Sequence, residues 1–149
     1  MDANEVIERL GMRRHPEGGW YAETWRAPSA DGQRPAGSAI YYLLAAGEAS
    51  HWHRIDATEI WHYYAGDPLT LRTAAGDDGP VTELTLGRDL AGDERPQAVV
   101  PIGAWQAARS LGAWTLVGCT VSPAFDFAGF ELAPPDWEPG QGEPGRQAR

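Results

Sequence analysis

The pattern of hydrophobic and polar positions changes once along this chain, at Gly11. Before it, the apolar residues between positions 6 and 10 recur with a helical period. Asp2 or Asn4 can cap such a helix at its start, and Gly11 stands where a helix commonly stops. The sequence therefore predicts one short N-terminal helix, followed by strands.

Ten segments after Gly11 are short and either alternating or continuously apolar, with Gly, Pro and Asp in the gaps between them. They cover residues 19–26, 38–46, 51–55, 59–65, 69–73, 81–86, 97–101, 104–110, 114–121 and 127–132. Short strands at such regular intervals are typical of a β-sandwich or a β-barrel. The predicted fold class is therefore all-β.

The chain of 149 residues predicts a single domain, which we place at residues 1–133. Residues 134–149 contain four prolines, three glycines and few apolar residues. Such a segment buries too little surface to offset its chain entropy. We therefore expect residues 134–149 to form a flexible tail.

The composition excludes several kinds of function. A net charge of −9 argues against a nucleic-acid surface, which needs a basic patch, and no apolar run of 18 residues is present to span a membrane. Cys119 is the single cysteine, so no disulfide forms within the chain. The acidic N-terminus lacks a signal-peptide core. We expect a soluble, cytoplasmic protein.

All 12 basic residues are arginine, so lysine chemistry is excluded and acid–base work must fall to His, Glu or Tyr. Three of the four histidines lie within twelve residues. On a regular strand His51 and His53 share a face, and Glu59 can join them if the next strand pairs back. Two histidines and a carboxylate form a set that suits Fe(II) and accommodates Mn, Ni or Zn.

Several blocks together resemble the cupin superfamily. His51-x-His53 followed by Glu59 and Gly66 is similar to its first motif, with one extra residue between His53 and Glu59. Residues 101–106 resemble the second motif, with Gln106 where the fourth ligand histidine usually lies. The blocks HPEGGWY, WHRIDATEIWHYYAGDPL, VPIGAWQAA, LVGCTVSPAFDF and FEL resemble a small uncharacterised branch, cupin-5, and run from about residue 6 to 133.

The resemblance implies a jelly roll, the cupin double-stranded β-helix, around a small-molecule cavity, and often a dimer. We expect a homodimer in which the early strand, with Tyr21 and Glu23, adds to the neighbouring sheet and covers its edge. The metal set would be His51, His53, Glu59 and Gln106. A bound divalent metal and a metal-free organic-ligand pocket both stay open.

The resemblance leaves three functions open for a small polar metabolite in the barrel. The first is an isomerase- or epimerase-like enzyme, by analogy with sugar-nucleotide epimerases of the same fold, in which His53 is the base, Glu59 assists and Tyr63 is the acid. The second is a metal-dependent oxygenase or lyase, and the third a non-catalytic binding or sensor module. The candidate ligand-binding residues are Gln106, Arg54, Trp61, Tyr21 and Glu23.

Overall fold

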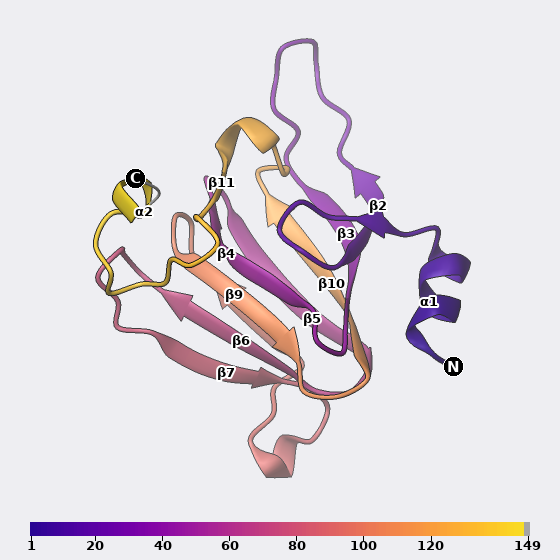
Figure 1. The fold of residues 1–149 in the computed structure, drawn as a ribbon. Coiled ribbons are helices and arrows are strands. Elements are labelled where there is room, and N and C mark those ends of the chain that lie inside the picture. The colour runs from indigo at the N-terminus through magenta and orange to yellow at the C-terminus, as the bar shows by residue number, and fades with distance from the viewer. Residues whose placement is uncertain (148–149) are drawn as a thin grey trace.

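The structure, a computed structural model, describes residues 1–147 and consists of two antiparallel β-sheets with a short helix at each end (Figure 1). The helices are α1 (Ala3–Leu10) and α2 (Pro144–Gln147), with short 3₁₀ turns at Leu90–Gly92 and Phe127–Gly129. The strands are β1 (Arg13–Arg14), β2 (Trp20–Arg26), β3 (Ser38–Ala45), β4 (Ala49–Ile55), β5 (Thr58–Gly66), β6 (Leu69–Ala74), β7 (Thr82–Leu86), β8 (Gln97–Val100), β9 (Trp105–Ser110), β10 (Trp114–Ser122) and β11 (Phe130–Leu132).

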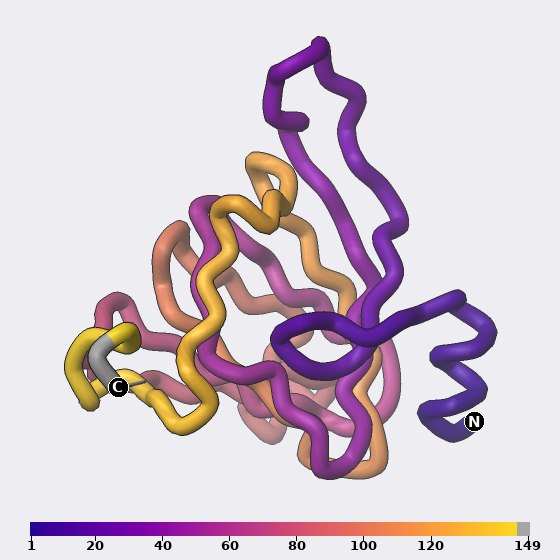
Figure 2. The backbone as a smooth tube through the Cα atoms, turned by 45° about the horizontal axis from the view of Figure 1, so that its top comes forward, coloured from indigo at the N-terminus to yellow at the C-terminus, as the bar shows by residue number. Residues whose placement is uncertain are grey.

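The two sheets have the strand orders β1-β2-β3-β10-β5-β8 and β11-β4-β9-β6-β7. Most neighbours in the middle of each sheet are distant in sequence, such as β3 and β10 or β4 and β9, as in a jelly roll. The predicted all-β fold with one short N-terminal helix is confirmed. Figure 2 shows the β2–β3 hairpin projecting beyond the rest of the fold. None of the helices within residues 1–147 is long and apolar enough to cross a membrane.

Helix α1 forms as its pattern predicts. The Asp2 carboxylate accepts a hydrogen bond from the Glu5 N–H at 2.9 Å, and Gly11 ends the helix in the left-handed region, at φ 62°. Val6 on the inner face of the helix is buried in a cluster with Met12 and Leu43. The helix therefore covers the outer side of β3.

The main core lies between the two sheets. Leu43 and Leu44 are neighbours on β3 and both fully buried, so this strand is covered on both faces. Leu44 packs in a cluster with Trp61 of β5 and Leu71 of β6, so both sheets contribute to it. This core holds the sheets at a fixed separation and leaves space beside it for a cavity.

The chain after β11 departs from the predicted flexible tail. Trp137 is only 1% exposed, and its ring lies 4.6 Å from that of Trp105 on β9. The Trp137 indole N–H donates to the Gly142 carbonyl at 2.9 Å, and the Gly140 N–H donates to the Asp77 carbonyl at 2.7 Å. The expectation of little buried surface is wrong here because one large aromatic ring anchors the segment. Residues 148–149 of the predicted tail lie outside the described residues.

Candidate functional site

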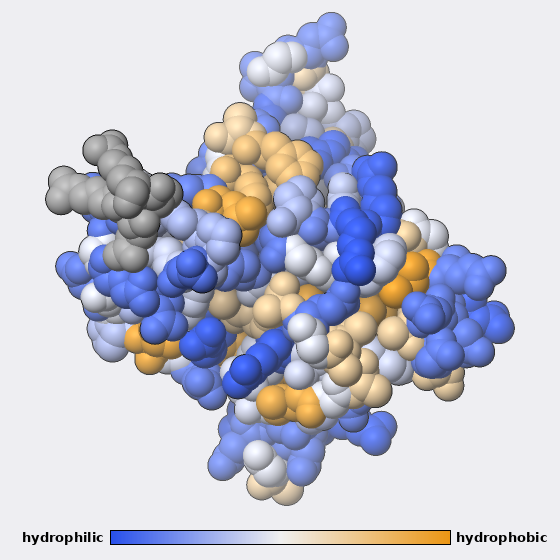
Figure 3. Space-filling view, viewed as in Figure 1, coloured by the Kyte–Doolittle hydropathy of each residue, from blue (hydrophilic) through white to orange (hydrophobic). Residues whose placement is uncertain are grey.

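A cavity of about 230 Å³ opens between β2, β3, β4, β5 and β10. Its inner part is polar, its outer wall is aromatic, and charged side chains surround its mouth. Figure 3 shows a hydrophobic patch over the β10–β11 connection, the segment in which Phe127 is 55% exposed. The inner residues are His15, Glu17, His53, Glu59 and Cys119, the wall is Phe125, Phe127 and Phe130, and the mouth includes Arg13, Tyr21, Glu23 and Arg26.

A tight glycine turn carries His15 and Glu17 into this cavity. The His15 carbonyl accepts the Gly18 N–H at 3.0 Å, and the His15 N–H donates to the Gly19 carbonyl at 3.0 Å. Gly18 and Gly19 have φ of 110° and 77°, and a Cβ on Gly18 would lie 2.0 Å from the Ala49 carbonyl oxygen. Only glycine fits there. The turn therefore packs directly on β4 and places both side chains beside His53.

His15 and Glu17 were not among the site residues predicted from the sequence. The available signal was the Gly-Gly pair that follows them directly in the HPEGG block, because two adjacent glycines indicate a tight turn. The direction in which the His15 and Glu17 side chains point depends on how the turn packs against β4. The periodicity of the sequence does not reveal this packing.

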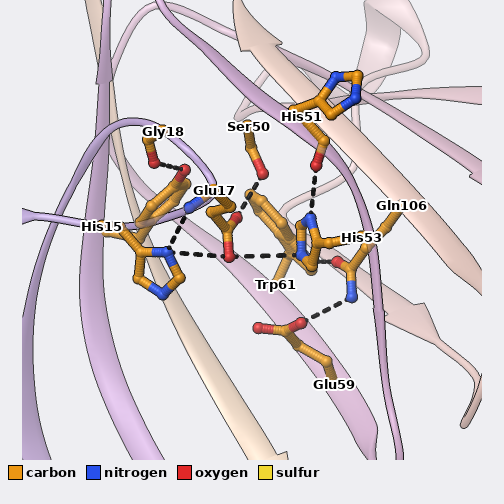
Figure 4. A network of polar contacts seen from close by, with 10 residues as sticks. His15, Glu17, Gly18, Ser50, His51, His53, Glu59, Trp61 and Gln106 are labelled. Carbon is orange, nitrogen blue, oxygen red and sulfur yellow. Dashed lines mark hydrogen bonds and ion pairs between the residues drawn. The ribbon is translucent and has the colours of Figure 1, made fainter. Parts of the chain in front are cut away.

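Glu17 lies at the centre of the polar cluster (Figure 4). One carboxylate oxygen, Oε1, is 3.3 Å from His15 Nδ1 and 3.5 Å from His53 Nε2. The other oxygen accepts a hydrogen bond from the Ser50 hydroxyl. The Glu17 backbone N–H donates to His15 Nδ1 at 3.1 Å, so the neutral His15 ring carries its proton on Nε2.

His53 has a defined tautomer. Its Nδ1 lies 2.7 Å from the His51 carbonyl oxygen, which only accepts hydrogen bonds, so the neutral ring carries its proton on Nδ1. The lone pair of Nε2 then faces Glu17 and the cavity. The ring is 2% exposed and lies 5.7 Å from the ring of Phe130. His53 is thus a fixed, desolvated proton acceptor.

Glu59 is held by a chain of hydrogen bonds from the barrel interior. The Trp61 indole N–H, which can only donate, bonds to the Gln106 side-chain oxygen at 2.7 Å. This fixes the orientation of the amide, whose N–H donates to Glu59 Oε1 at 2.8 Å. Gln106 and Trp61 therefore position the Glu59 carboxyl rather than contact a ligand.

Burial changes the protonation of the cluster. Desolvation raises the pKa of Glu17 and the pKa of Glu59 to about 7 each, and for Glu59 the nearby Glu17 adds to the rise. Desolvation also lowers the pKa of His15 to about 4 and lowers the pKa of His53. At neutral pH the histidines are therefore unprotonated, while the carboxyl groups still hold protons part of the time.

His51 does not join the cluster, and the expectation that it shares a strand face with His53 is wrong. A register shift between Ser50 and His53 interrupts the alternation of β4, so Ser50 and His53 both face inward. The His51 ring instead lies 2.8 Å from the Pro134 carbonyl oxygen on the outer side. Figure 4 shows the ring directed away from the cluster while its carbonyl oxygen points at His53.

Of the other site residues predicted from the sequence, two line the cavity and two lie outside it. Tyr21 and Glu23 line the cavity mouth. Tyr63 does not line it: its hydroxyl donates to the Gly66 carbonyl at 2.5 Å, at the far end of β5. Arg54 is on the outer face, where it pairs with Glu131 and stacks 4.4 Å above the Trp105 ring. Arg54 directly follows His53 on β4, and successive side chains on a strand point to opposite faces, so Arg54 points outward.

The proposed metal set does not fit this geometry. The His51 ring faces outward, and Gln106 directs its amide N–H, a donor that cannot ligate a cation, toward Glu59. Within residues 1–147 no group of three or more His, Cys, Asp or Glu side chains is arranged to hold a metal ion. His51, His53, Glu59 and Gln106 therefore do not converge on one point where a metal ion could be bound.

The raised carboxyl pKa values predict how stability depends on pH. Unfolding lets a buried carboxyl ionise at its ordinary pKa of 4.5, so its contribution to stability is complete below 4.5 and is lost as the pH rises through about 7. For Glu59→Gln this loss is absent. The free energy of unfolding of the variant relative to wild type should therefore rise by about 3 kcal/mol between about pH 4.5 and 8, because each unit of pKa difference between 4.5 and about 7 is worth about 1.4 kcal/mol.

Urea unfolding at several pH values measures this difference. His15 and His53 change stability in the opposite direction below pH 6.5. Glu59 is mostly protonated and uncharged at that pH, so replacing it by Gln changes the pKa of His53 little there and the histidine contributions nearly cancel in the comparison. The exposed Glu83→Gln on β7 is the matched control. A difference between Glu59→Gln and wild type that stays constant with pH would show that Glu59 is not a desolvated carboxyl.

Two facing antiparallel sheets around a polar cavity define a cupin barrel. The Cupin_5 family model, described as "Cupin superfamily (DUF985)", matches residues 4–133, and the chain belongs to this family. A crystal structure of a Shewanella oneidensis protein is 42% identical, with a TM-score of 0.83 over 89% of this chain and 84% of that one. A hypothetical protein from Leishmania major is 32% identical, with a TM-score of 0.80 over 88% and 86%.

More distant structures share the fold alone. Oxalate decarboxylase from Bacillus subtilis is 12% identical, with a TM-score of 0.62 over 80% of this chain and 29% of that one. No curated protein matches the sequence. The fold and the family are therefore shown, and the function has to be argued from the cavity.

Proposed function

We propose that this protein binds a small carbonyl compound in the barrel and moves a proton on the carbon next to the carbonyl, as an isomerase or epimerase does. The observation that carries the proposal is the fixed tautomer of His53. With Nδ1–H bonded to the His51 carbonyl, the basic Nε2 faces the cavity, as a general base requires. The low pKa of His53 keeps this nitrogen unprotonated at neutral pH.

The reaction balances without a redox partner. His53 Nε2 takes the proton from the substrate carbon, and the electron pair of that C–H bond moves into an enolate. A protonated carboxyl of Glu17 or Glu59 donates a hydrogen bond to the enolate oxygen, a role that a pKa of about 7 permits. Return of the proton to the other face, or to the adjacent carbon, gives the isomeric product. Tyr63 takes no part, because its hydroxyl is bonded elsewhere.

The neighbouring side chains support this assignment. Phe125, Phe127 and Phe130 form a wall in which ring centroids lie 4.7–5.9 Å apart, so they exclude water from one side of the cavity. The site thus combines an apolar wall with a few polar groups that converge, which is the usual form of a small-molecule site.

Deuterium exchange tests the proposal directly. Purified protein is incubated in D₂O with a panel of small aldehydes, ketones and keto acids, and the loss of the α-proton signal is followed by ¹H NMR. We expect exchange above the buffer rate for at least one compound. The rate should fall below pH 6.5 as His53 protonates and above about pH 7 as the carboxyl groups ionise. Buffer-level exchange across the panel would contradict the proposal and favour a binding module.

We further propose that the chain forms a homodimer through the edge of β2. The two-residue strand β1 pairs only with Trp20 and Tyr21, so residues 22–26 have no strand on that side within the described chain. Trp25 on this edge is 53% exposed. A second copy of β2 would satisfy the open edge and cover the tryptophan. Light scattering at micromolar concentration should give twice the chain mass, and a single species at the chain mass would overturn this proposal.

A further inference from the structure

One cation at the cavity mouth has no anionic partner. Arg13 on β1 lines the cavity, and its guanidinium carbon lies 5.3 Å from the ring centroid of Tyr21. Within residues 1–147 no carboxylate lies within 4 Å of this guanidinium. Its five N–H donors are thus free for a ligand that enters the barrel.

The other arginine at the mouth is already neutralised. Both carboxylate oxygens of Glu23 accept hydrogen bonds from Arg26, at 2.9 and 3.2 Å. A third hydrogen bond joins Arg26 to the Phe125 carbonyl at 3.0 Å, so this side chain links β2 to the aromatic wall. Arg26 and Glu23 therefore shape the mouth, and Arg13 provides its unbalanced positive charge.

Tyr21 places a second donor beside Arg13. The two residues are directly opposite each other in the β1–β2 ladder, and Tyr21 also lines the cavity. The Tyr21 ring is fixed edge-on to His15, at 4.7 Å between ring centroids, and its hydroxyl bonds to no other residue in the described chain. A guanidinium and a phenol on neighbouring strands thus face the same opening with unused hydrogen-bond donors.

We propose that the barrel ligand carries an oxyanion, a carboxylate or a phosphate, and that Arg13 and Tyr21 bind it at the mouth. This inference rests on the proposed function, in which the substrate is a carbonyl compound. It adds that the same substrate carries an anionic group. The carbonyl end would reach the polar cluster of His53, Glu17 and Glu59. The anionic end would stay at the mouth, away from the buried carboxyl groups that would repel it.

The charges of the cavity support this placement of the ligand, with its carbonyl end at the polar cluster and its anionic end at the mouth. A second anion beside Glu17 and Glu59 would be costly in a desolvated site, since like charges there cannot all ionise. A guanidinium, by contrast, binds a carboxylate or a phosphate through two parallel hydrogen bonds. The mouth is thus the place along this cavity where an anionic group gains a charged partner.

Binding of matched probes tests the inference. Each anionic probe is paired with a neutral analogue of similar skeleton: pyruvate with hydroxyacetone, and dihydroxyacetone phosphate with dihydroxyacetone. Dissociation constants come from ligand-observed NMR on wild type, Arg13→Gln and Arg14→Gln. Arg14 is the matched control, because it carries the same charge one position away but pairs with Glu48 and stacks on Trp20 outside the cavity.

For wild type and Arg14→Gln we expect at least one anionic probe to bind about tenfold more tightly than its neutral partner. Arg13→Gln should remove this preference without changing the affinity for the neutral probe. The carboxylate and phosphate pairs distinguish the two kinds of oxyanion. Equal binding within both pairs, no binding of any probe, or an unchanged preference in Arg13→Gln would overturn the inference.

The proposed function has a separate readout. Binding is measured without turnover, so an anion preference that depends on Arg13 stands even if no proton exchange is found. Conversely, exchange that depends on His53 but shows no anion preference would keep the proposed function and reject the role of Arg13.

Discussion

Replacing His53 by Gln lowers the rate of α-proton exchange by about 100- to 10,000-fold, the range that a positioned general base contributes. The amide of Gln can still donate to the His51 carbonyl and keep its place beside Glu17, but it has no basic nitrogen to accept the proton. The chemical step therefore loses its base while the shape of the cavity is retained. The rate is measured by ¹H NMR in D₂O, with the exchanging compound at saturation.

Two other histidines provide the controls. His51→Gln keeps the backbone carbonyl that holds His53 and changes only a ring on the outer side. His62→Gln changes a ring that lies 3.0 Å from the Thr120 hydroxyl, away from the cavity. Both variants should exchange within about twofold of wild type. If His51→Gln were as inactive as His53→Gln, the two side chains would act together and the outward position of His51 would be refuted.

Replacing Trp137 by Ala lowers the free energy of unfolding by about 3–5 kcal/mol, the usual cost of removing a large buried aromatic side chain. Trp137 is 1% exposed and packs against Trp105, which is fully buried. Its removal leaves a cavity beside Trp52 and Ala133, in the cluster that fixes the C-terminal segment to β4 and β9. Urea unfolding monitored by circular dichroism measures the change.

The control for this variant is Ile102→Ala, which truncates a side chain that is 63% exposed between β8 and β9. Its effect should stay within about 0.5 kcal/mol. A Trp137→Ala variant as stable as this control would mean that residues 134–143 contribute nothing to the fold, as their composition alone predicts.

The strands and the helix were predictable because each depends on local pattern. Gly11 and the apolar stripe before it define α1, and the alternating or continuously apolar runs define β2 to β10 to within a few residues. The two-residue strand β1 was not predicted, and residues 127–129 of the last predicted segment form a 3₁₀ turn before β11. The family could also be recognised from ordered sequence blocks, which the family model over residues 4–133 confirms.

The site was predictable only where the strands are regular. Glu59 and Trp61 point inward on β5 as parity requires, whereas the register shift in β4 reverses the expectation for His51. His15 and Glu17 were missed because their direction depends on how Gly18 packs against β4, far along the chain. The buried position of Trp137 was missed because the prediction of a flexible tail used the average composition of residues 134–149. A single buried aromatic ring can anchor a segment whose average composition is polar.

In the proposed reaction, neutral His53 presents an unprotonated Nε2 to the cavity. ¹⁵N NMR of the histidine rings, assigned with the His53→Gln variant, tests it most directly because the two ring nitrogens have different shifts when only one carries a proton. At pH 7 we expect a neutral His53 ring protonated on Nδ1, with titration only below pH 6.5. A ring protonated on Nε2, or a cationic ring at pH 7, would contradict it.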